Sequence, residues 1–355
     1  MKSTTLALIA LSLAVPACSS DDKNGGTSGA DAEYQQTVVT GMHSALLTDV
    51  NALHDAAEAL QAAAPTPTGR GWDAAQDAAA IDQMTQAWLR ARAAYERTEG
   101  ALAPLFPDTD AAIDARYEDF IEGVPGGDQD LFDDEGVTGM HAIERIIFAP
   151  KIPASVVDVE KTLPGYKAAA WPASEAEARA FKNELCARLV TDTQALADQW
   201  QPQSIDLDGA FNGLISLMNE QREKVNKAAS EEEESRYAQR TLADLRDNLA
   251  GTTRIYALFK DWLLTKSNGD KIDADVEASF SSLDTTYKGF SGDAIPAPPA
   301  TWSSEKPSAA DLQTPFGKLY SAVQDAVDPN VAGSAVDGMN RAASELGFQE
   351  FTEEE

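Results

Sequence analysis

The chain has 355 residues, of which 58 are acidic and 28 are basic, giving a formal net charge of −30. A surface this negative repels nucleic acid and anionic lipid headgroups, so a nucleic-acid partner is not expected, whereas cations are attracted. Roughly 320 residues follow the N-terminal segment, enough for one large hydrophobic core or two smaller ones.

The N-terminal residues predict an export signal. An apolar run over residues 5–15 follows Met1-Lys2 and is too short to stay in a bilayer as a spanning helix. Small residues then lead to Cys18, a pattern that resembles a bacterial lipobox and implies removal of residues 1–17 and a lipid on the Cys18 sulfur. Residues 18–32 predict a flexible tether. We expect an exported lipoprotein anchored to the outer membrane, facing the periplasm or the cell surface; an ordinary secreted protein is the alternative.

The rest of the chain predicts helices almost throughout, because apolar residues recur at three- and four-residue spacing and strand patterns are nearly absent. The predicted helices cover residues 34–63, 74–102, 114–122, 135–148, 174–200, 205–229, 232–265, 272–287, 309–327 and 331–348. We predict an all-α fold of two helical-bundle halves packed together, with residues 33–203 in the first and 204–350 in the second.

Cysteine and histidine, two residue types that often carry chemistry, are scarce here. If Cys18 is lipidated, Cys186 has no disulfide partner, and its place on the apolar side of a helix predicts a buried, inert thiol. The chain has only three histidines, and His43 and His54 are expected in the core or on the surface. No His-Glu-x-x-His or Gly-x-Ser-x-Gly motif is present, so the residues for a standard zinc or serine peptidase site are lacking.

The third histidine lies in a more informative pattern. His141 and Glu144 are three residues apart, which places both side chains on one face of a helix. The apolar run that follows them indicates a buried helix, and a buried glutamate is costly unless it is paired or coordinated. A metal ligand pair is therefore one interpretation, and a histidine paired with a nearby carboxylate on a solvated face is the other.

A second pair of acids, Glu96 and Glu99, has the same spacing on the preceding long helix. Trp88, Arg92 and Tyr95 lie along one stripe beside them. Intrahelical Glu–Arg pairs would explain these residues without a metal. Two such pairs on facing helices would instead form a carboxylate-rich site with one imidazole.

Together these residues resemble the imelysin-like family, which includes insulin-cleaving bacterial membrane proteases and periplasmic components of iron-uptake systems. The resemblance is carried by Gly139, His141 and Glu144 after a Trp/Arg/Tyr-Glu-x-x-Glu helix. A looser second block covers residues 232–245, with Asn248 and Gly251 beyond it. It implies two α-helical bundle halves around a cation site.

The resemblance also implies roles for individual residues. The implied metal ligands are His141, Glu144, Glu99, Glu96, Asp114 and Glu220. The implied pocket walls and supporting groups are Trp88, Arg92, Tyr95, Arg116 and Gly139.

One imidazole with several carboxylates and no thiolate disfavours copper(I) and structural zinc. We expect iron first, with zinc, manganese and calcium left open. The leading hypothesis is an exported lipoprotein that binds a metal ion or metal complex for iron uptake, with an uptake receptor or permease as partner. A metal-dependent peptidase and a metal-free module that binds a peptide or protein are the alternatives.

Overall fold

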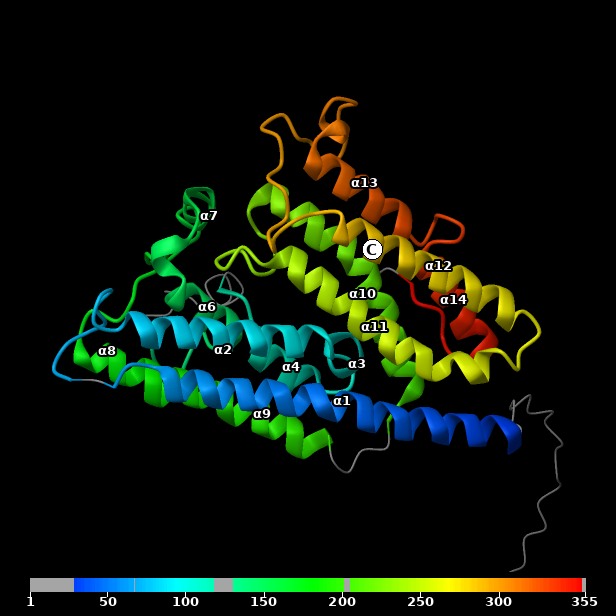
Figure 1. Cartoon of the computed structure of the whole chain (residues 1–355), viewed down its shortest axis with the longest axis horizontal. Helices are drawn as coiled ribbons and strands as arrows, with labels where there is room; N and C mark the ends of the chain where they lie inside the picture. Colours follow the sequence, from blue (N-terminus) through cyan, green and yellow to red (C-terminus); the bar gives the residue numbers. More distant parts are fainter. Residues whose placement is uncertain (1–28, 67, 118–129, 201–204, 353–355) are drawn as a thin grey trace, which may run out of the picture.

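The computed structural model describes residues 29–66, 68–117, 130–200 and 205–352. Within these ranges the regular structure is helical and no strand is present, so the all-α prediction is confirmed (Figure 1). The predicted signal peptide, Cys18 and most of the predicted tether lie outside the described residues, as does the predicted boundary near residue 203. In the described part of the chain, no helix combines the length and the apolar character needed to cross a bilayer.

The N-terminal elements pack around the longest helix. Helix α1 contacts both α2 and α9 along its length, and α4 and α6 complete this layer (Figure 1). The core side of α1 is made by fully buried residues at helical spacing, among them Met42, Leu46 and Val50. The helices of this part are α1 (Gly29–Ala63), α2 (Ala78–Glu96), α3 (Glu99–Leu102), α4 (Pro107–Asp114), α6 (Gly139–Ile147), α7 (Ala154–Glu160), α8 (Glu175–Ala180) and α9 (Cys186–Trp200).

The C-terminal elements form a second group of packed helices. Helix α10 contacts α11, α13 and α14, and α12 packs against α11, α13 and α14. The two groups meet where α11 crosses α1 and α2 and where α10 packs on α3 (Figure 1). These helices are α10 (Leu207–Lys227), α11 (Thr241–Leu263), α12 (Gly269–Lys288), α13 (Pro315–Val327) and α14 (Ala335–Leu346).

Short turns join several helices. They are the 3₁₀ turns η1 (Ala149–Lys151), η3 (Ala228–Ser230) and η4 (Asp311–Gln313), and one π-helical turn, η2 (Phe181–Leu185), between α8 and α9.

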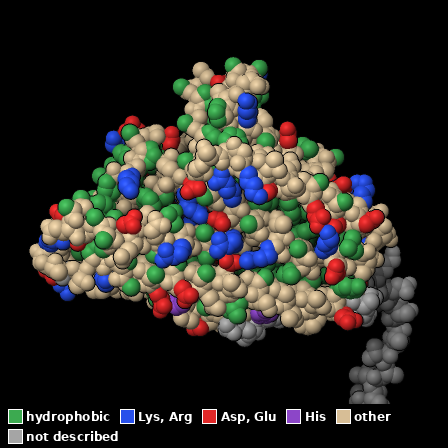
Figure 2. Space-filling model, in the orientation of Figure 1, with side chains coloured by type: hydrophobic (Ala, Val, Ile, Leu, Met, Phe, Trp, Pro, Cys, Tyr) green, Lys and Arg blue, Asp and Glu red, His purple; other side chains and the backbone are tan. Residues whose placement is uncertain are grey.

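Ion pairs and a glycine hold the two groups together. Asp49 on α1 forms ion pairs with Arg97, which follows α2, at 2.8 Å, and with Arg254 on α11 at 2.6 Å. A Cβ on Gly251 would lie 2.3 Å from the Arg97 carbonyl oxygen, so only glycine lets α11 come this close to the end of α2. Basic side chains gather around the middle of the face shown in Figure 2, although the whole chain is strongly acidic.

Several predicted helix boundaries are wrong. The helix predicted over 74–102 is interrupted: α2 ends at Glu96, and α3 begins at Glu99 after a turn in which Thr98 Oγ1 donates to the Tyr95 carbonyl. The predicted helices also omit most of α4, which begins at Pro107, because the missing N–H of proline costs nothing at the first helical position. The short helix predicted from residue 114 falls mostly outside the described residues, and α4 ends at Asp114.

Another wrong boundary matters for the site. The helix predicted from residue 232 begins only at Thr241. The preceding segment, residues 231–240, is a loop in which Glu231 and Gln239 have positive φ, at 61° and 54°. At the N-terminus, α1 begins at Gly29, inside the segment predicted as a tether, and Asp31 accepts from Trp262 Nε1 at 2.9 Å and from Lys266 at 2.8 Å.

Candidate metal centre

Charged side chains are buried where α2, α4, α6, α10, α11 and the 231–240 loop meet. Arg92, Glu96, Glu144 and Asp244 are 0 % exposed. Burying so many charges is expensive unless each is paired, hydrogen-bonded or coordinated. This cluster is therefore the part of the described structure in which chemistry is most strongly indicated.

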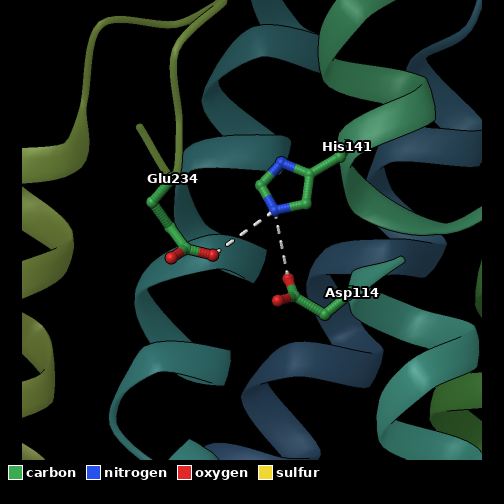
Figure 3. A group of neighbouring side chains, drawn as sticks. All are labelled: Asp114, His141 and Glu234. Atoms are coloured by element: carbon green, nitrogen blue, oxygen red, sulfur yellow. Dashed lines mark ion pairs between the residues drawn. The ribbon is translucent and has the colours of Figure 1, made fainter. Parts of the chain in front are cut away.

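Three side chains in the cluster come from three separate segments. Asp114 ends α4, His141 lies on α6, and Glu234 belongs to the 231–240 loop (Figure 3). His141 Nε2 lies 3.3 Å from Asp114 Oδ1 and 3.7 Å from Glu234 Oε1. One donor atom from each residue lies within 4.8 Å of the other two, a spacing suited to a single cation. His141 Nε2 is buried and makes no hydrogen bond, so the ring presents a nitrogen to this space.

Glu144 contacts the other side of the imidazole. Its Oε2 lies 2.8 Å from His141 Nδ1, and its Oε1 accepts from the Ala238 N–H at 2.8 Å. A carboxylate only accepts, so Nδ1 carries a proton and Nε2 is the nitrogen left to bind a cation. A carboxylate behind a ligating histidine fixes the tautomer and orientation of its ring. The structure thus places Glu144 behind the ring, away from the other two carboxylates.

The charges of the three residues are set by their neighbours. Burial opposes the charged form of each. Nevertheless Arg92 and His141 hold the pKa of Asp114 below its usual value, and Lys224 and Arg116 hold the pKa of Glu234 well below its own. Asp114 raises the pKa of His141 well above its usual value despite burial. Both carboxylates are therefore favoured in their ionised form, and a cation bound at Nε2 would take the place of a proton.

Two arginines support the carboxylates. Arg92 pairs through its guanidinium with Asp114 and Glu96, and donates to Glu234 Oε1 at 2.9 Å. Arg116 donates to Glu234 Oε2 at 2.8 Å. A carboxylate oxygen has two lone pairs, so these contacts orient Asp114 and Glu234 and still leave acceptor capacity. Both arginines lie where the sequence predicted supporting groups.

Glu99 faces a different cation, Lys224, and Glu96 lies between this cation and Arg92. Lys224 Nζ on α10 lies 3.3 Å from both carboxylate oxygens of Glu99 and 3.9 Å from Glu96 Oε2. Asn248 Nδ2 on α11 donates to Glu96 Oε2 at 2.5 Å and to Glu99 Oε2 at 2.9 Å. The structure brings this glutamate pair into the same buried cluster of charged side chains as His141, which we call the chamber. It does not bring the pair into the group of three formed by Asp114, His141 and Glu234.

Glu220, the remaining predicted ligand, lies further away. It accepts from Ser216 at 2.8 Å and, with Glu99 and Asp110, lines a cavity of about 330 Å³. Asp114 lines a separate cavity of about 860 Å³, together with acidic side chains that include Asp108, Asp134 and Glu135. The group of three is therefore open to solvent at Asp114, whose side chain is 15 % exposed.

The other predicted pocket residues position the elements of the site. Trp88 Nε1 donates to the Met140 carbonyl at 2.9 Å and so joins α2 to α6. Tyr95 donates to Asp110 Oδ1 at 2.7 Å and joins α2 to α4. Gly139 has a φ of +81°, and a Cβ there would lie 2.6 Å from the Ile113 carbonyl oxygen, next to Asp114.

Glu234 is not among the predicted ligands. The sequence predicts a helix there, whereas the structure has a loop that carries this residue to His141. A second buried network holds its loop in place: Tyr237 donates to Glu160 Oε1 at 2.5 Å, and Arg145 donates to Glu160 Oε2 at 2.9 Å. Lys224 is also absent from the predicted site residues. It continues the buried stripe of α10 after Gln221, and a charged residue at such a position indicates a buried partner of opposite charge.

Cys186, His43 and His54, which the sequence assigns to the core or the surface, lie in such positions. Cys186 is fully buried, and burial raises the pKa of its thiol. His43 packs against Trp200 with ring centroids 4.9 Å apart, and His54 Nδ1 contacts Thr193 Oγ1 at 3.1 Å.

The chain is similar to several known proteins. It is 24% identical over 244 residues to an Efem/EfeO family lipoprotein of Staphylococcus haemolyticus, covering 68% of this chain and 70% of the relative. It is 27% identical over 205 residues to the iron uptake system component EfeO of Escherichia coli K12, covering 58% of this chain and 44% of that protein. The chain thus spans less than half the length of the latter relative.

A solved structure shows the same fold. An imelysin-like protein from Psychrobacter arcticum 273-4 superposes with a TM-score of 0.55 over 90% of this chain and 98% of its own, at 13% sequence identity. The family model described as imelysin matches residues 39–326, which include the helices that supply the charged chamber. The chain therefore belongs to the imelysin family.

Proposed function

We propose that this protein is an exported iron-uptake component that binds one divalent metal ion through Asp114, His141 and Glu234. The observation that carries the proposal is the buried Nε2 of His141, which makes no hydrogen bond and faces two carboxylates. The names of the Escherichia coli and Staphylococcus haemolyticus relatives support iron as the metal.

The chemistry of the three residues fits such an ion. One imidazole and two carboxylates supply three ligands, and water from the cavity completes the coordination, as iron(II), manganese or zinc would accept. The cavity beside Asp114 has acidic walls that favour a hydrated cation over an anionic metal chelate. Glu144 serves to orient the ring, and Arg92 and Arg116 orient the carboxylates.

The relatives also support an envelope location. One is named a lipoprotein, and Cys18 follows a lipobox-like sequence in this chain. A lipid on Cys18 would anchor the protein to the outer membrane, where it would pass iron to an uptake receptor or permease. Labelling cells with a radioactive fatty acid tests the anchor, since Cys18→Ser abolishes incorporation if the proposal is right.

Metal titration tests the binding site. Calorimetry with iron(II) under anaerobic conditions, and with Mn²⁺ and Zn²⁺, is expected to give one ion per chain. His141→Ala removes the only nitrogen ligand and is expected to abolish binding. Glu144→Gln disturbs the orientation of the ring and is expected to weaken binding about 10- to 100-fold.

His54→Ala is the matched control, because it removes a histidine outside the site and is expected to leave affinity unchanged. Binding that survives His141→Ala at full strength would refute the proposed site. Chelator-sensitive cleavage of an unfolded protein, lost in His141→Ala, would instead favour the peptidase alternative.

A further inference from the structure

Lys224 is the buried cation of the chamber whose role the proposed site leaves open. It lies on α10 and is 5% exposed. Its Nζ lies 3.2 Å from Glu234 Oε2, 3.3 Å from both oxygens of Glu99 and 3.5 Å from Asn248 Oδ1. Glu96 Oε2 follows at 3.9 Å. An oxygen shell with three carboxylates around one positive charge is the environment of a bound metal cation.

Glu234 connects this ammonium group to the three-residue site. Its Oε1 faces His141 Nε2, and its Oε2 faces Lys224 Nζ. In proteins that hold two metal ions, a carboxylate commonly contacts one ion with each oxygen, and helical bundles build such sites from glutamates and histidines on facing helices. The chamber therefore has two adjoining cation positions, and the chain itself fills one of them.

We infer that Lys224 is an internal counter-ion that restricts the chamber to a single metal ion. This inference rests on the proposed function for the first position. It assigns Glu99 and Asn248 a distinct role, which is to hold the ammonium group next to Glu96. Lys224 thus determines how many metal ions the chamber holds.

Removing the ammonium group is expected to favour the binding of another cation in its place. Without Lys224, Glu99 and Glu234 lose the positive charge that lies between them and offsets their repulsion, while Glu96 keeps its pairing with Arg92. Glu99 also lines the cavity of about 330 Å³ beside α3 and α10, which provides a route for a hydrated ion. Lys224→Ala supplies both the space and the uncompensated charge.

The test is the number of Mn²⁺ ions bound per chain, measured by equilibrium dialysis, with electron paramagnetic resonance of the same samples. The wild type is expected to bind one ion with an isolated six-line signal. Lys224→Ala is expected to bind two ions and to show a spin-coupled signal, because Glu234 bridges the positions. One ion with an unchanged six-line signal in Lys224→Ala would overturn the inference.

Two control variants separate charge from space. Lys227→Ala removes an exposed lysine one turn further along α10, whose Nζ pairs with Glu223 at 2.7 Å, and is expected to keep one ion. Lys224→Met removes the charge but keeps the side chain's bulk, so it is also expected to bind one ion. Two ions in either control would contradict the inference, because binding would then not depend on vacating the ammonium position.

Instability of Lys224→Ala does not prevent the test. The double variant Lys224→Ala, Glu99→Gln removes one of the carboxylate charges left without a counter-ion, and its glutamine keeps an amide oxygen that can bind a cation. It is therefore expected to bind two ions, with lower affinity at the second position. Binding of a single ion would overturn the inference. Failure of the proposed function gives a different result, because the wild type would then bind no ion. If Lys224→Ala bound one ion and the wild type none, the result would still support a cation position occupied by the Lys224 ammonium group.

Discussion

Asp110 illustrates how the chamber sets the charge of a single side chain. Burial, followed by the nearby charge of Asp114, raises the pKa of Asp110 to about 7, although Tyr95 donates a hydrogen bond to it. An unfolded aspartic acid has a pKa of about 3.9. The folded state therefore holds this proton more tightly than the unfolded state, and the resulting stability is present at low pH and lost as pH rises from about 4 to about 7.

Asp110→Asn is expected to remove this pH dependence in the metal-free protein. The amide keeps an oxygen that accepts from Tyr95 but carries no charge to bury. Between pH 5 and pH 8, the stability of the variant relative to the wild type should rise by on the order of 2 kcal/mol. Urea unfolding at both pH values measures the difference. Asp108→Asn, on the exposed side of α4, is the control, and equal effects of the two substitutions would contradict the argument.

At the scale of elements, the start of α6 depends on Gly139. This residue has a left-handed backbone, at φ +81°, and lies against the end of α4, so the helix that carries His141 begins beside Asp114. Gly69 also has a left-handed backbone, at φ +79°, but nothing lies within 4 Å of a Cβ placed there. Comparing the same substitution at the two positions therefore separates the cost of the left-handed backbone from the cost of the steric contact.

Gly139→Ala is expected to destabilise the protein by at least about 2 kcal/mol more than Gly69→Ala. Alanine at either position pays the left-handed strain of about 1–2 kcal/mol, but only at residue 139 does the methyl group collide with the Ile113 carbonyl. Urea midpoints measure the stabilities. Metal affinity should fall only in Gly139→Ala, since His141 and Asp114 would move apart. Equal losses of stability would show that the close approach is unimportant.

On the scale of the whole molecule, a cation bound at the proposed site would tie the two helix groups together. Asp114 and His141 come from the first group and Glu234 from the loop that leads into α11. A metal ion that binds only the folded chain stabilises it by about 2.7 kcal/mol at 100 times its dissociation constant. The net charge of −30 adds a general repulsion, which any salt screens.

Two series of thermal melts are expected to separate these two effects, one with added Mn²⁺ at constant ionic strength and one with added NaCl. Mn²⁺ should raise the melting temperature of the wild type and of His54→Ala by a few degrees and leave that of His141→Ala unchanged. Added NaCl should raise all three equally. A rise of equal size with Mn²⁺ in His141→Ala would show that the ion acts by screening the acidic surface.

The sequence by itself determined the helical architecture, and two of the three residues of the candidate centre, His141 and Asp114, are among the ligands predicted from it. Helical periodicity and proline positions are local properties, so most helices lie where predicted, and the His141–Glu144 spacing is itself a consequence of helix geometry. The paired residues Glu96 and Glu99 likewise share one chamber. Their predicted role as ligands stays a prediction.

Only the tertiary structure decided which acids meet the imidazole. Glu234 lies 93 positions after His141 in the chain and reaches it through a loop with left-handed residues, where the local sequence favours a helix. Lys224 pairs with Glu99 from another helix, α10, and no spacing within α2 or α3 reveals this contact. Long-range electrostatics and packing set these partners, because a buried charge takes the nearest compensating charge in space, whatever its distance along the chain.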